Sequence, residues 1–129
     1  MRLIDFFDRG VLIEPDRAAF IDENGAITYR ETQIQTNQIA NALLSEGMEP
    51  GDVVAIYSPN DARAFLCMLG ALRVGAVYLN LNGLSLIEEN LYVLKDRGAR
   101  FLFVHSQFSE HLDVISNGAP HVTRVIGID

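Results

Sequence analysis

The feature of this sequence that most constrains its fold is the segment Val53–Tyr57, in which apolar residues follow one another without alternation. A strand with one exposed face alternates apolar and polar side chains, whereas a strand covered on both faces of a parallel sheet is apolar throughout. Similar runs follow at Ala76–Leu79 and Phe101–Val104, and we expect a fourth strand at Val122–Ile128. These runs predict a mostly parallel sheet that is covered on both sides.

Segments with helical signals separate the four strands, and capping and stop residues mark their limits. Helices are expected at residues 60–74 and 85–97, with a weaker one at 106–115. Asn60 is the expected N-cap of the first helix, and Ser85 and Glu88 have the spacing of a capping box. Gly75 and Gly98 are expected to end their helices in the left-handed conformation. The order β-α-β-α-β-α-β, with short connections, predicts right-handed crossovers and a three-layer α/β unit.

The residues before this unit carry different signals. The dipeptide Asn24-Gly25 lies between two β-prone runs, and both residues tolerate the positive φ of a tight hairpin turn. Thr28 and Glu31 have capping-box spacing for a helix that extends to about Glu46. We therefore interpret the chain as one α/β domain, residues 1–129, made of a helix or coil (1–16), a hairpin plus helix (17–52) and the α/β unit (53–129).

Composition and charge argue against several classes of function. Ten Lys and Arg against seventeen Asp and Glu give a formal net charge of −7 without a basic block, which disfavours a nucleic acid or an anionic membrane as partner. The single cysteine cannot form an internal disulfide, and no apolar run reaches the roughly 18 residues of a membrane-spanning helix. Asp5 introduces a charge where a secretory signal has an apolar core. We therefore expect a cytoplasmic protein with no nucleic-acid partner and no membrane span.

The sequence offers no complete catalytic or metal-binding constellation. Gly70 and Gly75 have the glycine spacing of a phosphate-binding loop, but Ala76-Val77 replaces the Lys-Ser/Thr pair that such a loop requires. These glycines lie within and after an expected helix, so we interpret them as a packing residue and a helix stop. Cys67 lies in the same apolar helix and is expected to be a buried, inert thiol. The chain has three histidines, His105, His111 and His121. No two of them have the i, i+4 spacing of a metal site on one face of a helix. No catalytic, cofactor-binding or metal-binding residue is therefore assigned.

One group of polar residues remains as a candidate site. In open α/β sheets, ligands bind beyond the carboxyl ends of the strands. At those ends the sequence has Ser58-Pro59-Asn60, Asn80-Leu81-Asn82-Gly83 and His105-Ser106. Caps and turns use the same residue types, so contact with a ligand and a purely structural role both stay open.

The segment Ala64–Leu72 is apolar on every face of its expected helix. A helix of this kind is normally buried on both sides, which is hard to arrange in a lone three-layer domain. Ile34 adds an apolar residue to the otherwise polar side of the preceding helix. These residues predict an exposed apolar surface that a partner covers, either the remainder of a longer parent chain or a second copy.

Several of these segments, in this order, resemble the beginning of the adenylate-forming superfamily of acyl-CoA synthetases, firefly luciferases and peptide-synthetase adenylation domains. Ile27–Glu31 is similar to the family's first core motif, Leu-Thr/Ser-Tyr-x-Glu-Leu, and Gly47–Ile56 to its Gly-x-x-x-Gly-Asp-x-Val-Ala-Ile run. Leu72–Leu79 resembles the second core motif, Leu-Lys-Ala-Gly-x-Ala-Tyr-Val-Pro, and Glu88–Arg100 resembles a stretch that ends in Asp-Ser-Gly-Ala-Arg. The resemblance covers about Arg17–Val104 and favours the acyl-CoA synthetase branch.

The resemblance implies that the chain is the N-terminal part of an ATP-dependent acyl-CoA synthetase, within a larger adenylate-forming N-terminal domain. The parent reaction would convert a carboxylate and Mg-ATP into an acyl-adenylate and pyrophosphate, and then transfer the acyl group to coenzyme A. Family members hold the phosphates with a Gly-rich loop that ends in Pro-Lys-Gly and use a C-terminal lysine, and neither occurs here. The only lysine, Lys95, lies late in an expected helix and is not carried over as catalytic.

The resemblance therefore implies ATP, magnesium and coenzyme A for the parent enzyme and none of them for this segment, which we expect to be inactive alone. The alternative, from another class, is a stand-alone α/β binding or interaction module without adenylation activity. The carboxylic acid substrate, and whether the acceptor is coenzyme A or another group, stay open.

Overall fold

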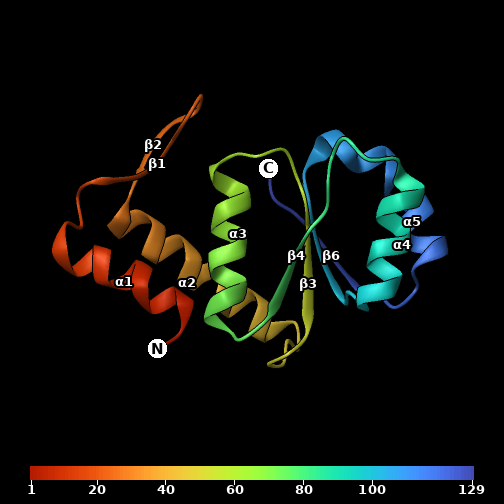
Figure 1. The fold of residues 1–129 in the computed structure, drawn as a ribbon, viewed down its shortest axis with the longest axis horizontal. Coiled ribbons are helices and arrows are strands. Elements are labelled where there is room, and N and C mark those ends of the chain that lie inside the picture. The colour runs from red at the N-terminus through yellow and green to blue at the C-terminus, as the bar shows by residue number, and fades with distance from the viewer.

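The N-terminal part of the chain contains two helices and a hairpin that projects away from the rest of the molecule (Figure 1). The computed structural model describes all residues from Met1 to Asp129. Its first elements are α1 (Leu3–Ile13), the antiparallel strands β1 (Ala18–Asp22) and β2 (Gly25–Thr28), and α2 (Tyr29–Ser45). A regular helix therefore occupies most of residues 1–16, and the expected hairpin and following helix are confirmed.

The rest of the chain forms a four-stranded sheet with its connecting helices. The strands are β3 (Val53–Tyr57), β4 (Val77–Asn80), β5 (Phe101–Val104) and β6 (Arg124–Gly127). The helices are α3 (Ala62–Arg73), α4 (Ile87–Arg97), the 3₁₀ helix η1 (Ser106–His111) and α5 (Leu112–Gly118). All strand pairs are parallel in the order β4-β3-β5-β6, so the expected parallel α/β unit is confirmed.

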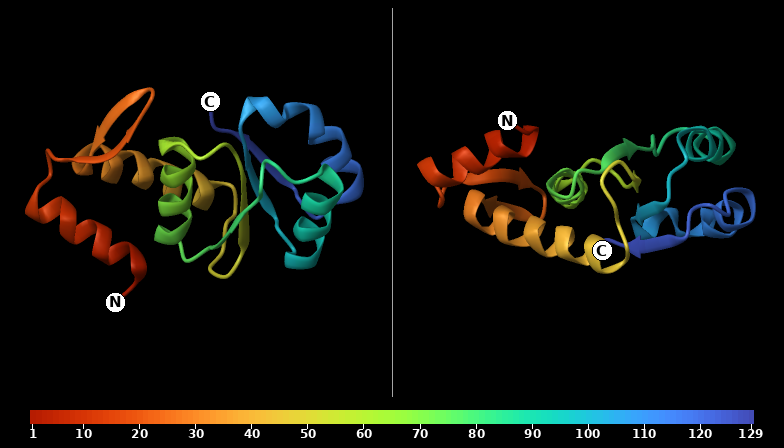
Figure 2. Two further views of the ribbon diagram at one scale, coloured as in Figure 1. Left: turned by 45° about the horizontal axis from the view of Figure 1, so that its top comes forward. Right: turned by 90° about the horizontal axis from the view of Figure 1, so that it is seen from below.

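The sheet lies between two layers of helices (Figures 1 and 2). Because β3 lies between β4 and β5, the chain moves along the sheet in one direction after β3 and in the other after β4. Right-handed crossovers then place α3 on one face and α4 and α5 on the other. Helices α1 and α2 lie on the α3 side (Figure 2). The predicted three-layer architecture is therefore confirmed.

Alternate residues of the central strands feed two separate cores, one on each face of the sheet. On the α4–α5 face, Ala55 and Leu102 pack with Leu94 and Ile115. On the α3 face, Val54, Ile56, Phe101 and Phe103 pack with Leu43 of α2 and Cys67 and Ala71 of α3. The unbroken apolar pattern of β3 and β5 is explained by this double burial.

The capping box at the start of α2 is formed as expected. Thr28 Oγ1 accepts a hydrogen bond from Glu31 N at 3.1 Å, and Glu31 Oε2 accepts one from Thr28 N at 2.9 Å. The preceding hairpin turn differs from the prediction, because only Gly25, and not Asn24, has a positive φ. Asp22 Oδ1 accepts the Asn24 N–H at 2.8 Å, so an aspartate side chain stabilises the turn in place of a left-handed asparagine.

Two expected helix starts are wrong by one or two residues. The N-cap of α3 is Asp61, whose Oδ1 accepts the Ala64 N–H at 3.0 Å, and not Asn60. Helix α4 begins at Ile87 after Leu86 without a side-chain cap, so the Ser85 capping box does not form. The predicted stop residues are correct, since Gly75 and Gly98 have φ of 76° and 64°.

Helix α3 is covered on two sides, by the sheet and by the N-terminal helices. At Gly70 an added Cβ would clash with the side chain of Ile39 in α2, so this glycine permits the close approach of the two helices. At the end of α3, Arg73 donates two hydrogen bonds to Asp8 of α1, at 2.7 and 3.0 Å, and one to Thr36 of α2. Helices α1 and α2 therefore bury most of the second apolar side of α3.

None of the helices combines the length and the apolar content needed to cross a lipid bilayer.

Candidate functional site

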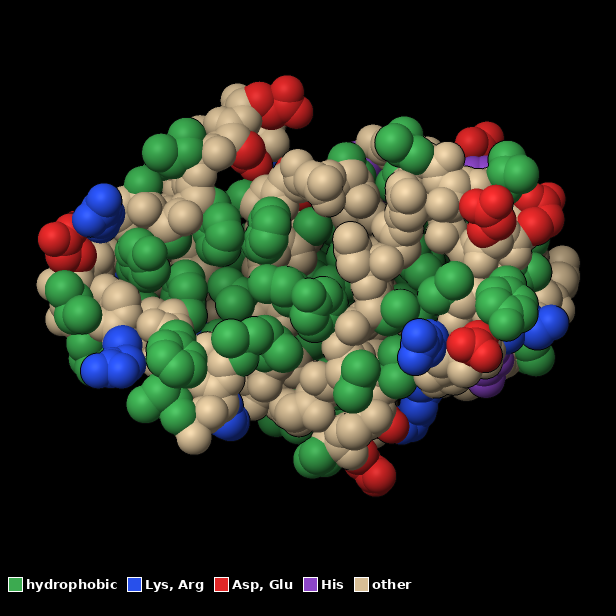
Figure 3. Space-filling view, in the orientation of Figure 1, with side chains coloured by type: hydrophobic (Ala, Val, Ile, Leu, Met, Phe, Trp, Pro, Cys, Tyr) green, Lys and Arg blue, Asp and Glu red, His purple; other side chains and the backbone are tan.

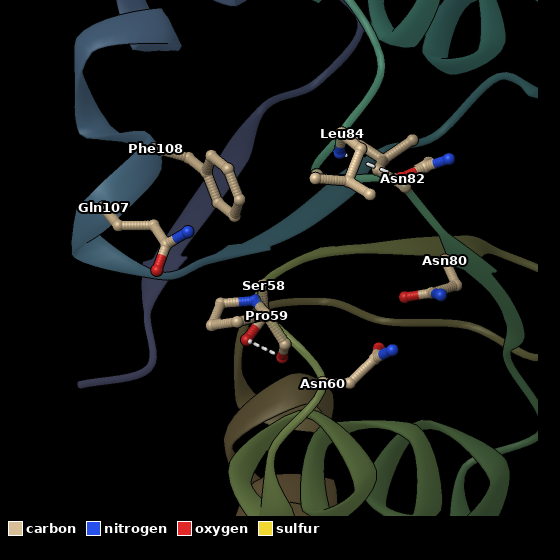
Figure 4. A pocket seen from close by; sticks show the side chains of 10 residues that line it. Ser58, Pro59, Asn60, Asn80, Asn82, Leu84, Gln107 and Phe108 are labelled. Atoms are coloured by element: carbon tan, nitrogen blue, oxygen red, sulfur yellow. Dashed lines mark hydrogen bonds between the residues drawn. The ribbon is translucent and has the colours of Figure 1, made fainter.

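A crevice of about 530 Å³ lies at the carboxyl end of the sheet (Figure 4). Because parallel strands end at the same edge, the segments that follow β3 and β4 meet there. Ten residues line the crevice: Ser58, Pro59, Asn60, Asn80, Leu81, Asn82, Gly83, Leu84, Gln107 and Phe108. The structure therefore brings two of the three predicted polar segments together. The third segment, His105-Ser106, does not line the crevice, and the next residues of η1 line it instead.

The loop after β4 is held in place by its own polar groups. Asn82 Oδ1 accepts the Leu84 N–H at 2.9 Å, and the carbonyl of Asn82 accepts a hydrogen bond from Asn90 Nδ2 at 2.9 Å. Asn90 is a buried residue of α4, so the loop is tied to the helix layer behind it. A Cβ on Gly83 would lie 2.6 Å from Phe108 Cζ, so only glycine allows the loop to approach this ring so closely.

Phe108 is the one aromatic residue that lines the crevice, and it is held in place by a second ring behind it. Phe108 of η1 stacks on Tyr57 of β3, with ring centroids 4.1 Å apart and planes 9° from parallel. Both residues are buried, and they belong to the core on the α4–α5 face. The sequence predicts a weak helix over residues 106–115, and the structure has the 3₁₀ helix η1 followed by α5 there. It did not predict that Gln107 and Phe108 line the crevice, since no local pattern shows which side of this segment faces the strand ends.

The polar side of the crevice consists of side chains without formal charge. Asn60 and Asn80 face each other across the ends of β3 and β4 (Figure 4). A carboxamide both donates and accepts hydrogen bonds, so this wall suits a polar, uncharged part of a ligand. The ten lining residues include no carboxylate for a metal ion and no Lys or Arg for a phosphate. The crevice therefore does not fit the triphosphate and magnesium of Mg-ATP.

His105 belongs to a structural cluster beside the crevice. Its Nδ1 accepts the Gln107 N–H at 3.1 Å, and its Nε2 lies 3.4 Å from Asp129 Oδ2. The hydroxyl of Ser106 donates to the same carboxylate, and its backbone N–H donates to Asp129 Oδ1 at 2.8 Å. Hydrogen bonds from Ser106 lower the pKa of Asp129. Because the serine hydroxyl binds the carboxylate and not the imidazole, the cluster joins the ends of β5 and β6 and does not activate a nucleophile.

The remaining candidate residues have packing roles. Cys67 is buried in the core between α3 and the sheet, and burial raises the pKa of its thiol to about 12. Gly70 and Gly75 are the packing residue and the helix stop that we expected, and not a phosphate loop. His121 Nε2 lies 3.0 Å from the carbonyl of Leu94. No group of three His, Cys, Asp or Glu side chains lies close enough to hold a metal ion.

The fold and the crevice define a three-layer α/β protein with a polar, uncharged crevice at the carboxyl end of its parallel sheet. The profile of the AMP-binding enzyme family matches residues 7–129, so the chain belongs to the AMP-binding enzyme family. This result confirms the resemblance and extends it beyond the core motifs that first indicated it.

Two curated relatives illustrate the similarity. A 3-oxocholest-4-en-26-oate–CoA ligase of Rhodococcus rhodochrous is 25% identical over 130 residues, which cover 100% of this chain and 23% of that ligase. A long-chain-fatty-acid–CoA ligase of Haemophilus influenzae is 32% identical over 123 residues, which cover 93% of this chain and 22% of that ligase. The chain thus spans about a quarter of the length of these two ligases.

Among solved structures, the anthranilate–CoA ligase AuaEII in complex with anthranoyl-AMP has a TM-score of 0.94 to this chain at 25% identity. The match covers 99% of this chain and 25% of that ligase. Almost the whole of this chain therefore has the backbone arrangement of one part of that CoA ligase.

Proposed function

We propose that this chain is the N-terminal part of an AMP-forming acid–CoA ligase and that it does not catalyse the reaction alone. The observation that carries the proposal is the match of almost the whole chain to a quarter of a ligase that holds an acyl-adenylate. In the parent enzyme, a carboxylate would react with ATP to give an acyl-adenylate and pyrophosphate, and coenzyme A would then take the acyl group. A fatty or aromatic acid is the substrate class that the relatives' names support.

The residues of the chain support a role as scaffold. In adenylation, negative charge is spread over the oxygens of the attacked phosphorus and develops on the leaving pyrophosphate, and cationic groups stabilise that charge. The chain's one lysine, Lys95, lies in the last turn of α4, and the crevice has no charged lining residue. With a net charge of −7, the chain as a whole disfavours a free nucleotide. Its carboxamide wall would instead border an uncharged part of a ligand whose charged groups are held elsewhere in the parent.

Two assays on the purified chain test the proposal. The first measures carboxylate-dependent pyrophosphate release over a panel of fatty and aromatic acids, with the intact Haemophilus influenzae ligase as positive control. The second is a calorimetric titration with Mg-ATP. We expect no signal in either assay. Pyrophosphate release that disappears when Asn80 and Asn82 are replaced by Ala would overturn the proposed inactivity.

Mg-ATP binding without turnover would favour the alternative function, a stand-alone binding module in the cytoplasm. The double variant Asn37→Ala/Asn41→Ala is the matched control for the two asparagine substitutions, because both residues are exposed asparagines of α2 outside the crevice. A binding signal that is lost in the Asn80/Asn82 variant and kept in this control would place the nucleotide in the crevice.

A further inference from the structure

A groove separate from the crevice lies between α2, α3 and β6, and we call it the α2–β6 groove. Its volume of about 470 Å³ is within the range of small-molecule sites. Phe103 of β5, Ile126 of β6 and the following Ile128 line it from the sheet, on the face that carries α3. The groove shares no lining residue with the crevice, so the two are different sites.

The two helices line the α2–β6 groove with regularly spaced side chains. On α2, Ile39 and Ala42 are three residues apart and share one face of the helix. On α3, Leu66 and Cys67 follow Arg63 by three and four residues, so these three side chains also share a face. Leu66 and Cys67 are only 5% and 4% exposed. The interior of the groove is therefore apolar.

Arg63 is the only charged residue that lines the groove. It lies in the first turn of α3, at the carboxyl edge of the sheet, and no carboxylate of the chain forms an ion pair with it. Its charge acts on Asp22 and Asp129 without direct contact. These carboxylates accept hydrogen bonds from other groups, Asp22 from the Ala62 N–H and Asp129 from Ser106. A guanidinium without a partner therefore lies at one end of an apolar groove.

We propose that the α2–β6 groove binds an amphipathic monoanion, an alkyl carboxylate such as a free fatty acid. The planar guanidinium of Arg63 matches a carboxylate and donates two parallel hydrogen bonds to it. The alkyl chain lies along Leu66, Phe103 and Ile126. Because Asp22 and Asp129 are near Arg63, a doubly charged head group such as a phosphate is disfavoured. The proposal does not rest on the proposed function, since it assigns no reaction to the groove.

The molecule has other apolar surfaces, from which binding in the groove must be distinguished. Apolar side chains gather over α3 on the face that Figure 3 shows. A hollow between α3 and β4 is lined by seven residues, none of them charged. An alkyl chain that binds there finds no cation for its head group, so an acid and the corresponding alcohol bind alike. Only binding beside Arg63 favours the acid.

Calorimetric titration of the chain with decanoate, below its micelle concentration, tests the proposal. Decanol and decyltrimethylammonium are the matched ligands, with no charge and with the opposite charge. We expect saturable one-to-one binding of decanoate and about tenfold weaker binding of the other two, because a charge-assisted hydrogen bond contributes a difference of this size. Decanoate that binds no more tightly than decanol overturns the proposal, as does the absence of saturable binding.

A substitution at Arg63 makes the titration specific. We expect Arg63→Gln to weaken decanoate binding about tenfold and to leave decanol binding unchanged. Arg9→Gln is the matched control, because Arg9 is also an exposed arginine without an ion pair, in α1 and outside the groove. Equal losses in the two variants overturn the role of Arg63.

A tryptophan reporter locates the ligand. The chain has no tryptophan, so Ala42→Trp places its only indole beside the groove. Asn41→Trp is the control, since Asn41 is the neighbouring exposed residue of α2 and does not line the groove. We expect decanoate to shift the emission of Ala42→Trp and not that of Asn41→Trp. Equal shifts in both overturn the assigned location, and if Ala42→Trp does not fold, the titrations of the unsubstituted chain and Arg63→Gln decide. Pyrophosphate release tests the proposed function separately, and none of these results changes it.

Discussion

Gly75 is a residue whose backbone conformation, and not its contacts, restricts the choice of side chain. Its φ of +76° lies in the left-handed region, and an added Cβ would make only ordinary contacts with Pro50. We expect Gly75→Val to lower the free energy of unfolding by about 1–3 kcal/mol, because a β-branched residue resists this conformation. Denaturant titration measures the loss. Gly127→Val is the control, since Gly127 lies in a strand without positive φ and has open space around it; equal midpoints for the two variants would contradict the assignment.

Asp8 is a residue whose contribution to stability depends on pH. Hydrogen bonds from Arg73 hold the pKa of Asp8 below its ordinary value of 3.8. The carboxylate therefore stabilises the fold above the unfolded-state pKa, and this contribution is lost as the pH falls through the lower folded-state pKa. We expect Asp8→Asn to cost about 1–3 kcal/mol at neutral pH, because it leaves the largely buried Arg73 guanidinium without its partner.

The cost of Asp8→Asn should shrink as the pH falls below 3.8 and vanish below the folded-state pKa, where Asp8 itself is uncharged. Urea titrations over this pH range measure the loss in the free energy of unfolding that Asp8→Asn causes. Asp16→Asn is the matched control: Asp16 also pairs with an arginine, Arg30, but its side chain is 82% exposed, so a change within about 0.5 kcal/mol is expected. A pH-independent cost of Asp8→Asn would show that the ion pair is not its origin.

At the scale of single elements, the start of α2 depends on its cap and the start of α4 does not. Thr28→Ala removes the acceptor for the Glu31 N–H and should lower the free energy of unfolding by about 1 kcal/mol. Ser85→Ala should change it by less than about 0.5 kcal/mol, because the hydroxyl caps no helix. Both residues have capping-box spacing in the sequence, but only Thr28 caps a helix in the structure. The two variants therefore test where α2 and α4 begin. A loss in Ser85→Ala equal to that in Thr28→Ala would contradict the observed start of α4.

At the scale of the whole molecule, the isolated chain exposes an apolar surface that the structure leaves uncovered. We expect it to bind a hydrophobic fluorescent dye and to self-associate weakly as its concentration rises. Tyr78→Lys should reduce both effects, since Tyr78 is 41% exposed and borders the apolar hollow between α3 and β4 together with Phe65 and Met68. Dye fluorescence and sedimentation over a range of concentrations measure them. A monomer at every concentration, without a dye signal, would contradict the prediction.

Local residue patterns were sufficient to predict most elements of this protein. The apolar runs at β3 and β5, the Thr28–Glu31 capping box and the stops at Gly75 and Gly98 all lie where the sequence places them. These signals are local, because caps and turns act within a few residues of the chain, and a strand buried on both faces carries its apolar pattern in consecutive residues. The ends of β3 and β4 could also be predicted to meet, since all parallel strands end at one edge of their sheet.

Long-range packing decided the features that the sequence did not show. Asp61 caps α3 in place of Asn60, Phe108 reaches the crevice by stacking on Tyr57, and Gly70 admits Ile39 of α2 against α3. The sequence by itself determined which segments form helices and strands and which edge of the sheet is polar. Only the tertiary structure decided the strand order, the lining of the crevice and the apolar face that stays uncovered. The physical reason is that these features depend on contacts between residues far apart in the chain, whose partners no local pattern specifies.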